Sequence, residues 1–271
     1  MSSRRALGLC ASASLLASLV GCGGNVAPAD VAPAPERPLP TATQSTCGSE
    51  ATQRVNVIAR ESDDNHTGRD TRGPLGATFS DCPASAAVRI DPFTPTGPSS
   101  QVVIPVDRPR SVLAWGPGYL TTRGPLISFD SPRFRGPGFS AAVEGLWAEE
   151  WRPRLSAAQA VAPTLVVFVG DGTGAGSDPG VPCHGAGVTM QLPDAPHATF
   201  GYLDATPTHA ISAAPVTSDA GVIVVGGLSA GAPPHATFNP PAGCVVRDVT
   251  TVAPLENGVV SIQYVWLAPA G

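Results

Sequence analysis

The sequence predicts an all-β protein built from two small β-sandwich domains, and three observations lead to that expectation. Short runs of β-branched and other apolar residues recur between turn-forming residues, a pattern typical of many short strands. The chain contains 30 glycines and 30 prolines, which supply the turns. Hydrophobic residues make up 42% of the chain, enough for a buried core. Many short strands joined by Gly and Pro turns favour a sandwich.

The first residues have the layout of an export signal. Arg4 and Arg5 precede a stretch of apolar or small residues, 6–20, as in secretory leaders. A transmembrane helix needs about 20 apolar residues, so this stretch is too short to span a membrane. We therefore expect residues 1–21 to be a signal peptide that is removed.

The leader ends in Leu19-Val20-Gly21-Cys22, which resembles the lipobox of bacterial lipoproteins. In that family the cysteine thiol is diacylated and the peptide bond before it is cut. The resemblance implies lipidation of Cys22 and cleavage between Gly21 and Cys22. Two acyl chains, at about 0.8 kcal/mol per buried methylene, hold a protein stably on a membrane. The alternative is an ordinary signal cleaved after a small residue, with Cys22 incidental.

Residues 22–46 consist largely of Ala, Pro and Thr, a composition that favours a stiff, extended tether. With the lipobox, this segment predicts a protein of the cell envelope that is held to a membrane through an N-terminal lipid. We expect the outer membrane rather than the inner one, with the folded part facing the periplasm or the cell surface.

The folded part divides into residues 47–135 and 164–271, each expected to form one sandwich, with a linker at 136–163. One short helix is predicted at 140–151, because Val143, Leu146 and Trp147 recur there at spacings of three and four, or one turn of a helix. The predicted strand runs are 55–58, 86–90, 101–104 and 111–115 in the first domain and 165–169, 188–192, 222–225 and 259–266 in the second.

Four cysteines remain once Cys10 leaves with the leader and Cys22 carries lipid: Cys47, Cys82, Cys183 and Cys244. An even number of thiols in an exported chain predicts two disulfides. Of the three possible connectivities we expect Cys47 with Cys82 and Cys183 with Cys244, since each pair then lies within one domain. No C-x-x-C spacing occurs, so a redox centre or thiolate zinc site has little support.

The charge of the chain argues against nucleic acid as a partner. Every basic residue is arginine, and loss of Arg4 and Arg5 with the leader changes the formal net charge from −5 to −7. A nucleic-acid-binding surface needs a basic stripe to contact phosphates, and the sequence contains none.

Two runs of the second half, 185–190 (G-A-G-V-T-M) and 217–228 (T-S-D-A-G-V-I-V-V-G-G-L), look like the transthyretin-like, carboxypeptidase regulatory-like β-sandwich. In that family a "G-A-x-V" strand precedes a "T-D-x-x-G-x-F-x-F-x-x-L" hairpin. In the first half, 76–79 and 112–119 resemble its second strand and its closing "A-x-G-Y" strand. The pattern departs at Ser229 and Ala230, where prolines are usual, and the second half has no "G-Y" ending. An immunoglobulin-like sandwich is the structural alternative.

This resemblance implies an accessory domain rather than an enzyme. In carboxypeptidases the sandwich accompanies a separate zinc catalytic domain, and no His-x-x-Glu ligand pair occurs at any of the five histidines. We therefore expect no peptidase activity.

The run 227–231 (G-L-S-A-G) fits G-x-S-x-G, the nucleophile elbow of α/β-hydrolases, with Ser229 as the nucleophile. The elbow requires a helix directly after the serine, and Pro233 and Pro234 oppose one. His235 lies six residues beyond Ser229 and is the last histidine, so the order of acid and then histidine is missing. We expect a hairpin loop and no catalytic residue, with a serine hydrolase as the alternative.

Two further patterns are candidate ion sites. Residues 170–178 form a glycine-rich loop with Asp171 and Asp178; it lacks the Lys-Ser/Thr of a phosphate loop, and weak calcium binding is the alternative to a plain connection. The pentapeptide P-H-A-T-F occurs at 196–200 and again at 234–238. If the two copies were neighbours, His197 and His235, with His184 or His209, would make a metal site. We expect a repeated strand-edge pattern instead, with no metal or cofactor.

The remaining candidate site consists of aromatic residues. We expect Trp147 with Trp151, and Trp115 with Tyr119, to pack in the core or between domains rather than form a sugar platform. The sequence as a whole predicts a non-catalytic binding or structural module whose partner is an envelope protein or a glycan. A serine hydrolase and a carbohydrate- or metal-binding module are the alternatives.

Overall fold

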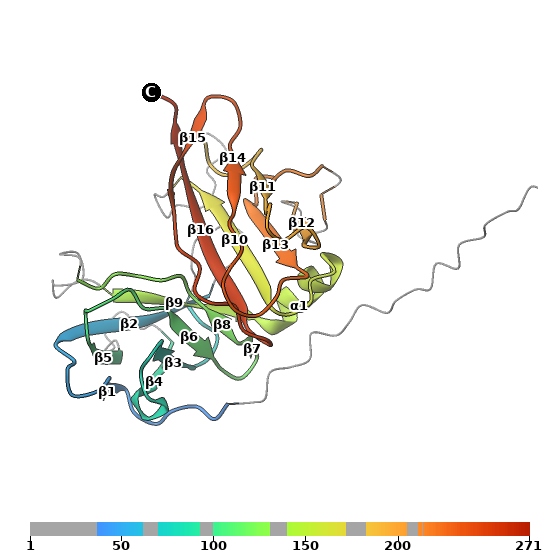
Figure 1. Cartoon of the computed structure of the whole chain (residues 1–271). Coiled ribbons are helices and arrows are strands. Elements are labelled where there is room, and N and C mark those ends of the chain that lie inside the picture. The colour runs from blue at the N-terminus through green and yellow to red at the C-terminus, as the bar shows by residue number, and fades with distance from the viewer. Residues whose placement is uncertain are drawn as a thin grey trace, which may run out of the picture.

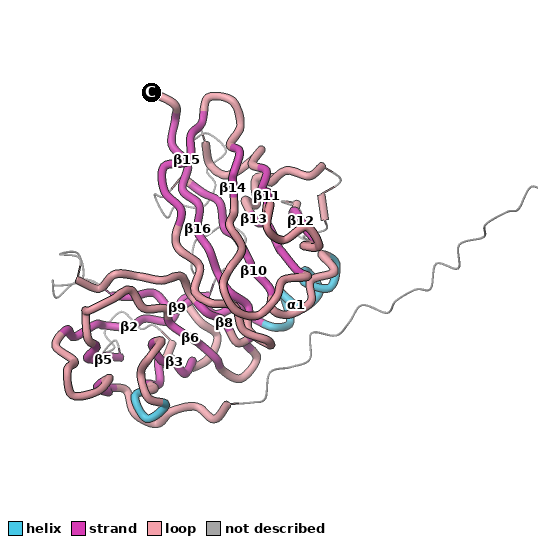
Figure 2. Tube along the Cα trace, viewed as in Figure 1, coloured by secondary structure: helices cyan, strands magenta, loops and turns pink. Residues whose placement is uncertain are grey.

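The computed structural model describes residues 37–61, 70–92, 100–130, 140–171, 183–204, 211–212 and 214–271. Within these ranges the chain forms sixteen strands and one α-helix, so the predicted all-β class is confirmed (Figures 1 and 2). Gly21 and Cys22, with the leader and most of the tether, lie outside the described residues. No helix of the described part is long and apolar enough to cross a membrane.

The first half contains the short 3-10 turn Ala84–Ala86 and nine strands: β1 (Gln44–Thr46), β2 (Gln53–Glu61), β3 (Leu75–Phe79), β4 (Val88–Ile90), β5 (Ser100–Ile104), β6 (Val112–Trp115), β7 (Tyr119–Leu120), β8 (Thr122–Arg123) and β9 (Ser140–Trp147). The second half contains the helix α1 (Ala148–Ala157) and seven strands: β10 (Thr164–Gly170), β11 (Thr189–Gln191), β12 (Thr199–Tyr202), β13 (Val222–Gly226), β14 (Thr237–Asn239), β15 (Cys244–Val249) and β16 (Val260–Pro269).

These strands form three sheets. A five-stranded sheet has the order β1-β5-β2-β9-β7, and β11 pairs with β14 in a separate two-stranded sheet. The nine-stranded sheet has the order β12-β13-β10-β16-β8-β6-β3-β4, with β15 also pairing with β16. This large sheet therefore contains strands from both predicted domains, and their division into two separate sandwiches stays a prediction.

Strand β16 joins the two halves (Figure 1). On one edge it pairs in parallel with β10, from Thr164 opposite Val260 to Gly170 opposite Trp266. On the other edge, Val260 and Ser261 pair with β8, and the end of the strand pairs with β15. The C-terminal strand is thus the only link, among the described pairings, between β10 and the strands of the first half in this sheet.

The cores explain the apolar runs of the sequence. In the first half, alternating residues of β2, β5 and β9 pack against β3, β4 and β6 in one cluster, as in a sandwich. In the second half, β10 and β13 are buried at every position. One face of β10, with Leu165, Val167 and Val169, lies in one cluster, and the opposite face, with Val166 and Phe168, lies in another. Strands covered on both faces are continuously hydrophobic rather than alternating.

The helix predicted at 140–151 is wrong in its position. Residues 140–147 form strand β9, which pairs in parallel with β2, and α1 begins only at Ala148. Ala141 and Val143 face the core of the first half at a period of two, and this pairing overrides the local helical spacing. The acidic residues Glu149 and Glu150 lie in the first turn of α1, where negative charge stabilises a helix.

The tether was predicted to extend to residue 46, but its last residues belong to the folded part. The carbonyl of Ala42 accepts a hydrogen bond from the Arg89 amide at 2.7 Å, and that of Thr43 accepts one from the Gln101 amide at 2.9 Å. Residues 44–46 then pair in parallel with β5. Composition did not reveal this, because the contacts use backbone atoms that every residue carries.

The shared sheet makes a prediction about cooperativity. Ile262 of β16 is fully buried, so Ile262→Ala should cost about 2–5 kcal/mol of unfolding free energy. Because β16 joins both halves, hydrogen exchange followed by mass spectrometry should show β3 and β13 losing protection together. Val245→Ala is the control: Val245 is 44% exposed on β15, and its truncation should change stability by less than about 0.5 kcal/mol. Loss of protection in β13 with none in β3 would contradict a common sheet.

Candidate functional site

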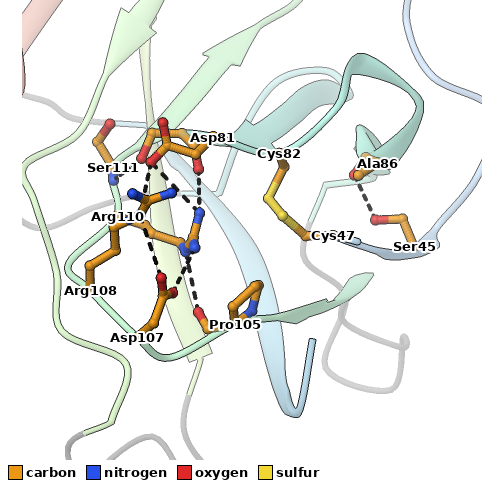
Figure 3. The surroundings of a disulfide bond; sticks show 11 residues. Ser45, Cys47, Asp81, Cys82, Ala86, Pro105, Asp107, Arg108, Arg110 and Ser111 are labelled. Carbon is orange, nitrogen blue, oxygen red and sulfur yellow. Dashed lines mark hydrogen bonds and ion pairs between the residues drawn. A yellow bond between two sulfur atoms is a disulfide. The ribbon is translucent and has the colours of Figure 1, made fainter. Parts of the chain in front are cut away.

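The predicted disulfide pairing is confirmed. Cys47 pairs with Cys82, with a Cα–Cα distance of 5.1 Å, and Cys183 pairs with Cys244 at 5.7 Å. The first bond ties the residue after β1 to the turn after β3 (Figure 3). Disulfides of this kind persist in oxidising compartments, as expected of an exported chain.

Close to the first disulfide, Arg110 links two turns (Figure 3). Its side chain is only 3% exposed. Nε donates to the Pro105 carbonyl at 3.2 Å and Nη1 to the Ser80 carbonyl at 2.9 Å. Nη2 donates to Asp107 at 2.8 Å, and this bond holds the pKa of the Asp107 carboxyl below its ordinary value. Every guanidinium nitrogen is therefore engaged within the protein, and the geometry is that of a crosslink rather than an anion-binding site.

A second charged cluster surrounds Glu61, the last residue of β2, whose side chain is fully buried. The Tyr119 hydroxyl donates to Glu61 at 3.0 Å, and Arg72 lies 3.1 Å from the other carboxylate oxygen. Arg72 also pairs with Glu150 of α1, and its backbone amide donates to the Tyr119 hydroxyl at 2.8 Å. Its guanidinium stacks 5.0 Å above the ring of Trp147. This cluster joins β2, β7, β9 and α1 around the segment that begins at residue 70.

The electrostatics of this cluster favour a structural role. Burial, reinforced by the hydrogen bond to Glu61, raises the pKa of Tyr119 to about 12. Tyr119 therefore remains protonated at neutral pH and acts as a donor rather than as a base. The hydrogen bond to Glu150 raises the pKa of the Arg72 guanidinium, which stays charged. A site for general acid–base catalysis needs a group that titrates near the working pH, and neither of these two does.

No local sequence pattern marks this cluster, because Tyr119 lies 58 residues beyond Glu61 and Glu150 lies 78 residues beyond Arg72. One signal was present. Val55, Val57 and Ala59 face inward at a period of two along β2, and Glu61 occupies the next inward position. A charged residue at an inward position of an alternating strand indicates a buried ion pair, since a lone buried charge is too costly.

Ser229 lies in an exposed loop after β13. The residues that follow it form no helix: Gly231 makes an isolated bridge to Leu255, and the next regular element is β14. A nucleophile elbow uses the first backbone N–H of a helix for its oxyanion hole. The local structure at Ser229 does not provide one.

The two P-H-A-T-F copies begin strands in different sheets. Thr199 starts β12, which pairs with β13, whereas Thr237 starts β14, which pairs with β11. The structure therefore does not place the two copies on neighbouring strands, and His197 and His235 are both exposed. The Nε2 atom of His184 instead lies 2.9 Å from the Oδ1 atom of Asp219.

The remaining ion-site candidates lie partly outside the described residues, which exclude His209 and, in the glycine-rich loop, everything from Gly172 to Asp178. Among the residues that are described, no three His, Cys, Asp or Glu side chains are grouped so as to hold a metal ion.

The tryptophans identified in the sequence lie mostly in the core. Trp151 is fully buried and packs edge-on against Phe168 at 5.8 Å, and Trp147 meets Tyr119 edge-on at 5.0 Å. The exposed large hydrophobic residues of the described part are Val161, Val245 and Val249, none of them aromatic. A sugar-binding platform requires an exposed aromatic face, which these residues do not provide.

The buried cluster makes a prediction about pH. An unfolded tyrosine ionises near pH 10, whereas Tyr119 in the folded protein ionises near pH 12. The stabilisation from its protonated form is complete below pH 10 and is lost as the pH rises through 12. Urea unfolding should show this loss in the wild type and in a Tyr202→Phe control.

In Tyr119→Phe this component of the loss should be absent. The same variant should be less stable at pH 7 by about 1–3 kcal/mol, because Glu61 loses a buried hydrogen bond. An equally steep loss above pH 10 in Tyr119→Phe and the wild type would contradict the assignment.

Comparison with known proteins gives no family. No protein-family profile and no curated protein matches the chain. Among solved structures, the Bacillus anthracis TIE protein aligns over 81% of this chain with 11% identity and a TM-score of 0.22, and this chain spans only 34% of its length. A streptococcal ancillary pilin aligns over 78% of this chain and 69% of its own, with 9% identity and a TM-score of 0.21. These likenesses assign neither a family nor an activity.

Proposed function

We propose that this protein is a lipid-anchored envelope lipoprotein whose folded part is a non-catalytic binding or structural β-sandwich module. The observation that carries the proposal is the pair of disulfides. Disulfides form outside the reducing cytosol, in agreement with the export signal of residues 1–21. The L-V-G-C string that ends at Cys22 then adds the lipid anchor.

The length of the tether limits how far the folded part can lie from the membrane. Fifteen residue steps separate Cys22 from Arg37, the first described residue. A chain of that length spans at most about 50 Å when fully extended. A lipid on Cys22 would therefore hold the sandwich within about that distance of a membrane, where it meets envelope proteins and glycans rather than distant partners.

The absence of catalysis is part of the proposal, and two observations support it. The charged side chains of the two most buried clusters, around Arg110 and Glu61, are used to crosslink turns and strands. Ser229, the one residue that matched a catalytic motif, lies in a loop without the required helix. The resemblance to the carboxypeptidase regulatory-like sandwich, an accessory domain, agrees with a role in binding or architecture.

The anchor is tested with Cys22→Ala. Alanine has no thiol to accept acyl chains, so processing at the Gly21–Cys22 bond should stop and the lipid should be lost. Metabolic labelling with a fatty-acid analogue, together with detergent phase partitioning, measures both effects, and Cys10→Ala is the matched control. A Cys22→Ala protein that is still cut at this bond and still partitions into detergent would overturn the lipoprotein assignment.

The hydrolase alternative is tested at Ser229. An activated serine reacts covalently with fluorophosphonate probes, because a neighbouring base removes its proton. We expect the purified protein and Ser229→Ala to show the same background labelling, with labelling of heat-unfolded protein as the baseline. Strong labelling that disappears in Ser229→Ala would replace the binding module with a hydrolase.

A further inference from the structure

The segment 37–42, here called the strap, lies against Trp115 at the end of β6. The Trp115 indole N–H donates to the Pro38 carbonyl at 3.2 Å. The Arg37 guanidinium stands over the same ring, 5.7 Å from its centre. Trp115 is only 7% exposed, although Arg37 and Pro38, the strap residues that contact it, are themselves exposed. The strap thus meets this side chain in two ways, through its polar N–H and through its ring.

Gly76 makes the contact possible. It lies opposite Trp115 in the pairing of β3 with β6. A Cβ at position 76 would meet the indole ring at 2.6 Å and the Pro40 Cδ at 2.8 Å, both too close for real atoms. The indole ring and Pro40 therefore both pack directly onto the Gly76 backbone. Trp115 and Gly76 together form a seat, the Trp115 seat, that accepts a proline ring.

The chemistry of this seat is that of proline-rich peptide recognition. Proline fixes φ near −65° and carries no N–H, so a segment with prolines at 38 and 40 loses little entropy when it binds. Aromatic grooves bind such segments by ring packing. Here an indole hydrogen bond to a carbonyl adds to that packing, and a cation–π contact from Arg37 adds a further attraction.

The strap is attached in a way that allows release. Arg37 and Pro38 are exposed, Leu39 and Pro40 are half-buried, and regular strand pairing begins only at Gln44. Segments with few buried contacts and no backbone ladder open at much lower free energy than core strands. The chain beyond the strap is fixed separately by β1 and by the Cys47–Cys82 bond. Opening of residues 37–41 therefore does not require the sandwich to unfold.

We propose that the Trp115 seat binds proline-containing extended segments of the type Arg-Pro-x-Pro, and that the strap is its intramolecular occupant, displaceable by a partner that carries such a segment. This inference supplies a site for the binding role proposed above and in that sense rests on it. It does not depend on the lipid at Cys22. Because a tethered segment competes at an effective concentration of about millimolar, the closed strap excludes a free peptide that is not in excess.

The test uses the whole mature chain in detergent micelles and a synthetic peptide of residues 33–43 as the probe. 5-Fluorotryptophan NMR reports Trp115, whose line is assigned by its loss in Trp115→Phe. In the double variant Pro38→Ala/Pro40→Ala the strap should leave its seat, the Trp115 line should shift, and the peptide should bind at least tenfold more tightly than to the wild type. Thr41→Ala, a change at an exposed strap residue, is the matched control and should behave as the wild type.

Two outcomes would overturn the inference. One is a Trp115 line in the double variant that matches the wild type, with no gain in peptide affinity. The other is peptide binding to the double variant that survives the additional change Trp115→Phe, which keeps an aromatic ring but removes the N–H donor. Binding that survives replacement of both peptide prolines by alanine would count in the same way. Membrane partitioning of Cys22→Ala is measured separately, so failure of the anchor and failure of the seat remain distinguishable.

Discussion

The architecture depends on strand β16, because its two edges pair with different strands and these come from both halves of the chain. Its first edge pairs in parallel with β10 from Val260 to Trp266, while its second edge is shared between β8 and β15. Parallel neighbours require long connections, and here the strand that completes the sheet is the last element of the chain. The contacts that join the halves are therefore among the most distant in sequence, which is a feature of slow-folding topologies.

Around this sheet, buried charges fix segments that have no regular pairing. Removing one partner of a buried ion pair typically costs about 3–5 kcal/mol, whereas replacing the whole pair by apolar groups is often neutral. Glu61 and Arg110 therefore contribute more to geometry than to net stability. Glu61 positions the segment at Arg72 against β7 and α1, and Arg110 holds the turn after β3 against the loop after β5.

The sequence could predict what depends on local patterns. The all-β class followed from short apolar runs, and the disulfides followed from cysteine number and position. The prediction of a helix at 140–151 was wrong, because the spacing of Val143, Leu146 and Trp147 is compatible with a helix and with a strand. Pairing with β2 makes this segment a strand. The double pairing of β16 and the cluster at Glu61 join residues that are distant in the chain. The docking of Ala42 and Thr43 uses their backbone carbonyls, which no residue pattern encodes.

The Cys47–Cys82 disulfide determines how far a force applied to the N-terminal segment can extend the chain. A pulling force on Arg37 acts first on the contact of the strap with Trp115 and then on the short parallel pairing of β1 with β5. Both contacts are non-covalent. At Cys47 the load divides, because a covalent bond carries it directly to the turn beside Arg110. Stretching before that stop is limited to residues 37–46, about 35 Å of chain. The disulfide thus acts as a strain limiter, and a reducing medium would let the same pull continue into β2.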